Sequence, residues 1–170
     1  MSYDLNVLCV NQRNVLNMPF ATSIEIRNEL DFPDSSRYHS IWPFMSSING
    51  VWYTLGKAGE SGFNALSIIS SDFDKEIGIA SMPYWLLCDD DYDDIKSNIT
   101  PIAINDIYKK DVESVMHVLI QQSPSNMIMF LARYQGGEKE IIQGVVHYSK
   151  FKQLLNQSKV FFNTCYIITS

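Results

Sequence analysis

The sequence has few of the features that mark secreted or membrane proteins. Its three cysteines, Cys9, Cys88 and Cys165, are odd in number and far apart, which predicts reduced thiols in a reducing compartment. No window approaches the roughly 18 apolar residues that a membrane span needs. Residues 1–4 contain no basic region ahead of an apolar core, as a signal peptide would. These absences predict a cytoplasmic protein that makes no membrane contact.

Positive charge is also scarce. The chain has 13 lysine and arginine residues against 19 aspartate and glutamate residues, a net charge of −6. A general nucleic-acid binder needs a basic surface to contact phosphates, so direct nucleic-acid binding is not expected. The charge balance instead favours a basic protein partner.

No motif for metal binding or catalysis is found. Asp89, Asp91 and Asp93 match positions 1, 3 and 5 of a calcium loop, but Asp94 replaces the glycine at position 6 and Thr100 the glutamate at position 12. The sequence therefore predicts no cofactor, no metal and no enzymatic activity.

The isolated histidines and cysteines point the same way. His39, His117 and His147 have no spacing that would pair two of them on one helix face, so His117 and His147 are expected to be packed or hydrogen-bonded. Cys9 and Cys165 lie in apolar runs and are expected in the core. A Cys/His or Ser/His site that is assembled only on folding stays open, because such sites are recognised by geometry.

The apolar pattern predicts one α+β domain over residues 1–170, with a mixed or mainly antiparallel sheet. Apolar residues make up 46% of the chain, enough for a substantial core. A long helix is predicted over about 105–122, with Asn105 as its N-cap, and a short helix over about 149–156. The apolar positions of the long helix that recur at helical spacing are Tyr108, Val112, Val115, Met116 and Leu119.

Short runs rich in β-branched and aromatic residues predict the strands. They cover residues 3–10, 22–27, 51–55, 66–70, 77–80, 127–134, 139–148 and 159–169. The glycine-containing stretch 56–62 predicts that the runs 51–55 and 66–70 form a hairpin.

An acidic run preceded by large apolar residues is the most distinctive stretch of the chain. Five aspartates fall within six positions, and the cluster contains no basic residue that could pair with them. Aromatic side chains beside charge are typical of binding hot spots, whereas carboxylates steer a basic partner. We therefore predict a partner-binding surface formed by Tyr84, Trp85, Asp89, Asp90, Asp91, Tyr92, Asp93 and Asp94.

Other interpretations of the chain stay open. The run can be a solvated acidic turn that only aids solubility. The chain can also be a small enzyme or ligand-binding domain whose pocket is lined by Trp42, Trp52, Tyr53 and the loop 31–47. A third interpretation is a DNA-mimic inhibitor of a nucleic-acid-binding protein.

In length, acidity and composition the chain resembles bacterial immunity proteins of the contact-dependent growth inhibition type. The likeness is carried by the Asp89 to Asp94 run with Trp85 and Tyr92, and by a composition heavy in asparagine, isoleucine and serine. It implies a cognate toxin domain as partner, commonly a nuclease that acts on tRNA, rRNA or DNA. It also implies inhibition by covering the toxin's basic active-site cleft, without a cofactor.

Overall fold

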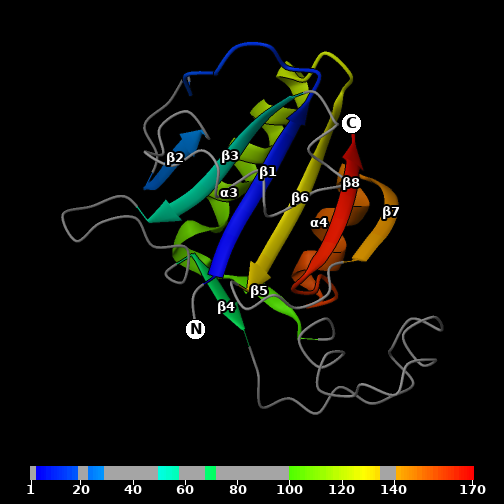
Figure 1. Cartoon of the computed structure of the whole chain (residues 1–170). Coiled ribbons are helices and arrows are strands. Elements are labelled where there is room, and N and C mark those ends of the chain that lie inside the picture. Colours follow the sequence, from blue (N-terminus) through cyan, green and yellow to red (C-terminus); the bar gives the residue numbers. More distant parts are fainter. Residues whose placement is uncertain (1–2, 19–22, 29–49, 58–67, 72–99, 135–140) are drawn as a thin grey trace.

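The computed structural model describes residues 3–18, 23–28, 50–57, 68–71, 100–134 and 141–170 (Figure 1). Six strands form the main sheet, in the order β2-β3-β1-β6-β8-β7. Their bounds are β1 (Tyr3–Val10), β2 (Ile24–Asn28), β3 (Gly50–Lys57), β6 (Met127–Tyr134), β7 (Ile141–His147) and β8 (Thr164–Thr169). All neighbours are antiparallel except β7 and β8, which are parallel. The predicted α+β class with a mixed, mainly antiparallel sheet is confirmed.

The central strands β1 and β6 are apolar on both faces of the sheet. Along β1, Leu5, Val7 and Cys9 belong to the large core cluster that includes both helices, whereas Leu8 and Val10 belong to a second cluster on the opposite face. Successive side chains of a strand point to opposite faces, so a strand covered on both sides becomes a near-continuous apolar run.

Helix α3 (Asp106–Gln122) lies behind β1 and β3 in Figure 1. Asn105 occupies the N-cap position as predicted, although its side chain makes no capping hydrogen bond. Ser123 ends the helix, where its N–H donates to the carbonyls of Leu119 at 3.0 Å and Ile120 at 3.2 Å. The predicted apolar stripe is confirmed as the buried face, formed by Tyr108, Val112, Val115, Met116, Leu119 and also Ile120.

Helix α4 (Tyr148–Asn156) connects the two parallel strands and confirms the predicted short helix. His147 is its N-cap, and the ring Nδ1 accepts a hydrogen bond from the Ser149 N–H at 3.2 Å. Parallel neighbours cannot be joined by a tight turn, so a crossover is required, and α4 provides it. Both helices lie on the same face of the sheet (Figure 1).

The predicted hairpin over 51–55 and 66–70 is wrong. Both edges of β3 are occupied, by β1 and by β2. Strand β4 (Ile69–Ser71) instead pairs with β5 (Ile102–Ile104) in a separate two-stranded sheet. The strand predicted over 77–80 lies outside the described residues. No helix in the described part of the chain is long and apolar enough to cross a membrane.

Candidate functional site

The residues predicted to bind a partner lie outside the described residues. They are Tyr84, Trp85, Asp89, Asp90, Asp91, Tyr92, Asp93 and Asp94. Their role stays a prediction from sequence.

Charge is divided unevenly between the described framework and the rest of the chain. The described residues include nine lysines and arginines and five aspartates and glutamates, a net charge of +4. The other segments contain 14 acidic and four basic residues, a net charge of −10. Five of those 14 acidic residues are the aspartates of the run that ends at Asp94.

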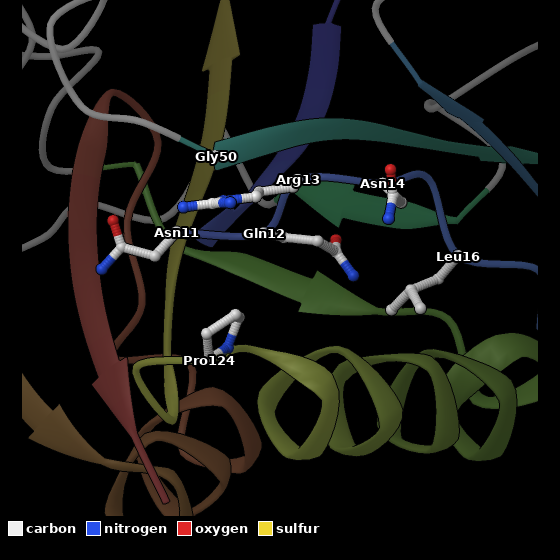
Figure 2. Close-up of a pocket in the computed structure, with 7 residues that line it drawn as sticks. All are labelled: Asn11, Gln12, Arg13, Asn14, Leu16, Gly50 and Pro124. Atoms are coloured by element: carbon white, nitrogen blue, oxygen red, sulfur yellow. The ribbon is translucent and has the colours of Figure 1, made fainter.

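Within the described residues, a cleft of about 890 Å³ opens where β1 ends and β3 begins. This volume is in the range of small-molecule sites, roughly 300 to 1,000 Å³. Loop 11–16 forms one side, and Pro124, which follows the C-cap residue of α3, forms the other (Figure 2). The described lining consists of Asn11, Gln12, Arg13, Asn14, Leu16, Gly50 and Pro124.

Gln12 is the buried polar residue of this cleft, with 7% of its surface exposed. The Leu16 N–H donates to the Tyr53 hydroxyl oxygen at 3.0 Å, and the Tyr53 hydroxyl donates to Gln12 Oε1 at 2.7 Å. Burial raises the pKa of Tyr53, so the hydroxyl keeps its proton at neutral pH. Because that proton goes to Gln12, the amide must present its oxygen to Tyr53. The Gln12 NH2 group is therefore directed away from Tyr53.

Two asparagines with positive φ shape the turns beside the cleft. Asn11 has φ 61° and Asn126 has φ 50°, a backbone region that asparagine tolerates better than most residues. Asn11 Nδ2 donates to Ser125 Oγ at 2.5 Å and so ties the loop after β1 to the turn after α3. These turns fix the two walls relative to each other.

Ser123 joins the same walls from inside. Its hydroxyl oxygen lies 2.9 Å from the Val10 carbonyl oxygen and 2.7 Å from the Met127 carbonyl oxygen. The single hydroxyl proton can go to either carbonyl. This buried serine therefore links the end of α3 to the end of β1 and the start of β6.

Gly50 lets β3 approach β1 closely at the rim of the cleft. A Cβ atom at this position would lie 2.5 Å from the Cys9 carbonyl oxygen and 2.8 Å from Leu8 Cδ1. The first contact is with backbone, which cannot move aside cheaply. Any side chain at residue 50 would displace one of the two strands.

A second hollow of about 370 Å³ is lined in part by residues 15–18. Leu16 and Tyr53 line it together with the inward side chains of β2. Trp52 belongs to the cluster on the opposite face of the sheet. Trp52 and Tyr53 therefore do not face one common pocket, and Trp42 with the loop 31–47 lies outside the described residues.

The described histidines and cysteines do not assemble a reactive centre. Burial raises the pKa of the Cys9 thiol to about 11, and its Sγ donates to the Leu119 carbonyl at 3.2 Å. Cys165 is buried as well, so the prediction that both are core residues is confirmed. His147 caps α4, and His117 lies near the Tyr148 ring, with 6.4 Å between the ring centroids. In the described part of the chain, no group of histidine, cysteine and acidic side chains could hold a metal ion.

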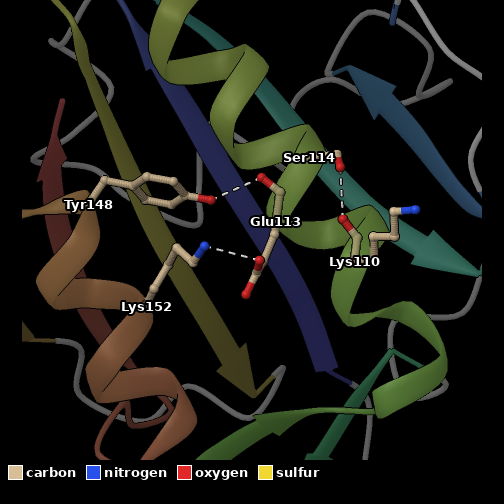
Figure 3. Close-up of polar contacts among 5 residues, drawn as sticks. All are labelled: Lys110, Glu113, Ser114, Tyr148 and Lys152. Carbon is tan, nitrogen blue, oxygen red and sulfur yellow. Dashed lines mark hydrogen bonds and ion pairs between the residues drawn. The ribbon is translucent and has the colours of Figure 1, made fainter.

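Polar contacts between the two helices fix their relative position (Figure 3). The Tyr148 hydroxyl donates to the Glu113 backbone carbonyl at 2.9 Å, and Lys152 Nζ lies 3.1 Å from Glu113 Oε2. Burial, with a smaller effect of the Glu113 charge, raises the pKa of Tyr148 to about 12. The hydrogen bond and the ion pair are both made between α3 and α4, so this contact holds the two helices together.

The sequence did not predict this cleft. Its parts come from residues 11–16, 50 and 124, which only the pairing of β1 with β3 and β6 brings together. The polar run Asn11-Gln12-Arg13-Asn14 directly after an apolar strand was the available signal, and it predicted only a turn. Comparisons with models of protein families, with curated proteins and with solved structures give no match.

Proposed function

We propose that this chain is an immunity protein that binds and neutralises a cognate bacterial toxin, most simply a nuclease. The acidic and aromatic run Tyr84 to Asp94 would occlude the toxin's basic active-site cleft. The observation that supports this is the run itself, in which five aspartates within six positions lie beside Trp85 and Tyr92 in a chain of net charge −6.

The physical argument begins with the target. A nuclease holds phosphates with lysine and arginine side chains, so its substrate groove has positive potential. Carboxylates at close spacing can occupy such a groove in place of phosphates and increase the association rate through long-range attraction. Trp85 and Tyr92 supply the rigid apolar contact that slows dissociation. This mechanism uses no cofactor and no reaction on the inhibitor.

The test measures association with a catalytically inactive toxin domain encoded beside this chain. In one variant Asp89, Asp90, Asp91, Asp93 and Asp94 are all replaced by asparagine. We expect the association rate at low salt to fall by about tenfold or more, with a weaker dependence on salt. Trp85→Ala should mainly increase the dissociation rate, because anchor residues act after encounter.

A matched variant separates the position of the charge from its amount. Changing Asp31, Asp34, Asp72 and Asp74 to asparagine and Glu60 to glutamine also removes five negative charges. This control should bind nearly as fast as the unmodified chain. Equal slowing in both variants, or unchanged kinetics in the first, would remove the run from the interface.

A further inference from the structure

The cleft beside β1 has an unusual combination of lining groups. The described lining includes one cation, Arg13, and three amide side chains, but no carboxylate. In a protein with 19 acidic residues, a concave surface whose described lining has a cation and no carboxylate favours an anionic ligand.

The buried amide defines the direction of that interaction. Tyr53 holds Gln12 by its oxygen, so the Gln12 NH2 group presents its donors on the side away from Tyr53. Gln12 lines the cleft, and in Figure 2 its side chain lies below Arg13 and above Pro124, with its amide toward the Leu16 side. A fixed donor of this kind favours an acceptor oxygen, because the orientation is set before the ligand arrives.

We propose that this cleft binds a ligand with one carboxylate group and a short apolar body. The carboxylate accepts hydrogen bonds from the Gln12 amide and the Arg13 guanidinium, whose planar fork matches a carboxylate. Arg13 is the one charged group in the described lining, which suits a single negative charge better than a phosphate dianion. The site is independent of the proposed inhibitor function.

The end of α3 sets the orientation of the ligand in the cleft. The last carbonyls of a helix carry partial negative charge and repel an anion. Ser123 N–H satisfies the Leu119 and Ile120 carbonyls, and Pro124, which has no N–H, stands between the helix end and the cleft. The carboxylate therefore lies toward Gln12 and Arg13, and the apolar body lies against Pro124 and Leu16.

The experiment follows the amide NMR signals of the ¹⁵N-labelled full chain during titration with N-acetyl-leucine. N-acetyl-leucinamide, which has the same body without the charge, is the ligand control. We expect saturable shifts centred on residues 11–16 with a dissociation constant of about 1 mM, which corresponds to a binding free energy of about −4 kcal/mol. The neutral amide should produce no saturable shift.

Three variants test the assigned contacts. Arg13→Gln should weaken binding by about tenfold or more, the usual scale for a hydrogen bond to a charged group. Gln12→Glu keeps an acceptor for Tyr53 but replaces the donors with negative charge, so binding should be lost. Lys57→Gln removes one exposed positive charge at the far end of β3 and should bind like the unmodified chain.

Thermal unfolding of each variant checks that it is folded. Arg13→Gln changes only an exposed side chain and is expected to fold. It therefore tests the site even if Gln12→Glu does not fold. A peptide ending in leucine with a free carboxyl terminus distinguishes the source of the carboxylate. Tighter binding of the peptide would assign the cleft to a chain terminus, and tighter binding of N-acetyl-leucine would assign it to small acids. The proposal is overturned if the unmodified chain gives no saturable shifts, if the neutral amide binds equally, or if Arg13→Gln binds unchanged.

Discussion

The two faces of the six-stranded sheet carry different kinds of side chain. On the face covered by the helices, large rings meet in the core: Phe130 of β6 lies 5.0 Å from Phe151 of α4, and Phe151 lies 5.5 Å from Tyr166 of β8, between ring centroids. All three side chains are nearly inaccessible to solvent. Contacts of this kind add specific geometry to apolar burial.

On the opposite face, the exposure of side chains to solvent changes along a single row of paired residues. The register places Trp52, Leu8, Met129, Ile167 and Val145 side by side across five strands. Leu8 is fully buried, whereas Val145 is 69% exposed. In the adjacent row the Thr54 hydroxyl donates to Asn6 Oδ1 at 3.0 Å, so one polar pair lies beside the buried Leu131. The helix-covered face thus provides a continuous core, and the other face is divided between apolar, polar and exposed parts.

The largest effect is expected on the helix-covered face. Phe130→Ala removes a fully buried ring between β6 and α4, and should lower the free energy of unfolding by about 3 to 5 kcal/mol. Urea unfolding followed by tyrosine and tryptophan fluorescence measures the change. A loss below about 1 kcal/mol, the typical effect of a random substitution, would show that this cluster does not dominate the core.

A smaller loss of stability is expected at Leu8, which lies on the opposite face of the sheet. Leu8→Ala also removes a fully buried side chain, but its paired neighbour Trp52 is only partly buried and can relax toward the space. We expect a cost of about 2 to 3 kcal/mol in the same urea experiment. A cost equal to that of Phe130→Ala would mean that the two faces are packed equally well.

Gly50→Ala tests the close approach of β3 to β1. The added Cβ meets the Cys9 backbone, and the strain should cost about 1 to 3 kcal/mol. Gly144→Ala is the contrasting control on β7: nothing lies within 4 Å of its Cβ position, but its φ is +106°, so only backbone strain acts there. If the alanine at residue 50 were tolerated, β1 and β3 would have to be able to separate without loss of pairing.

The smallest effect concerns alkaline pH. Burial raises the pKa of Tyr148 to about 12 from 10.0, so the folded state holds this proton more tightly than the unfolded state does. The resulting contribution to stability is complete below pH 10 and disappears as the pH rises toward 12. Tyr148→Phe removes the bond to the Glu113 carbonyl, should cost about 0.5 to 1.5 kcal/mol at pH 7, and should reduce the loss of stability above pH 10. Urea titrations at pH 7 and 10.5 check both effects; an unchanged slope with pH would contradict the assignment.

How far the sequence predicted this molecule depends on the range of the interactions. Both helices followed from local periodicity, because the side chains at i, i+3 and i+4 share one face. Strand pairing did not follow: β3 and β4 are close in sequence, yet β3 pairs with β1 and β2. The cleft was beyond reach for the same reason, since Gln12, Gly50 and Pro124 meet only through long-range pairing.

The central position of β1 has a consequence for synthesis. This strand, Tyr3–Val10, pairs with β3 and with β6, which ends at Tyr134. At roughly 5 to 20 residues per second, a ribosome completes Tyr134 about 6 to 25 s after Val10. The apolar strand β1 is therefore without its neighbour β6 for most of the time that translation of the sheet requires. Until β6 is made, that edge of β1 presents unpaired backbone N–H and C=O groups, which can pair with a strand of another chain.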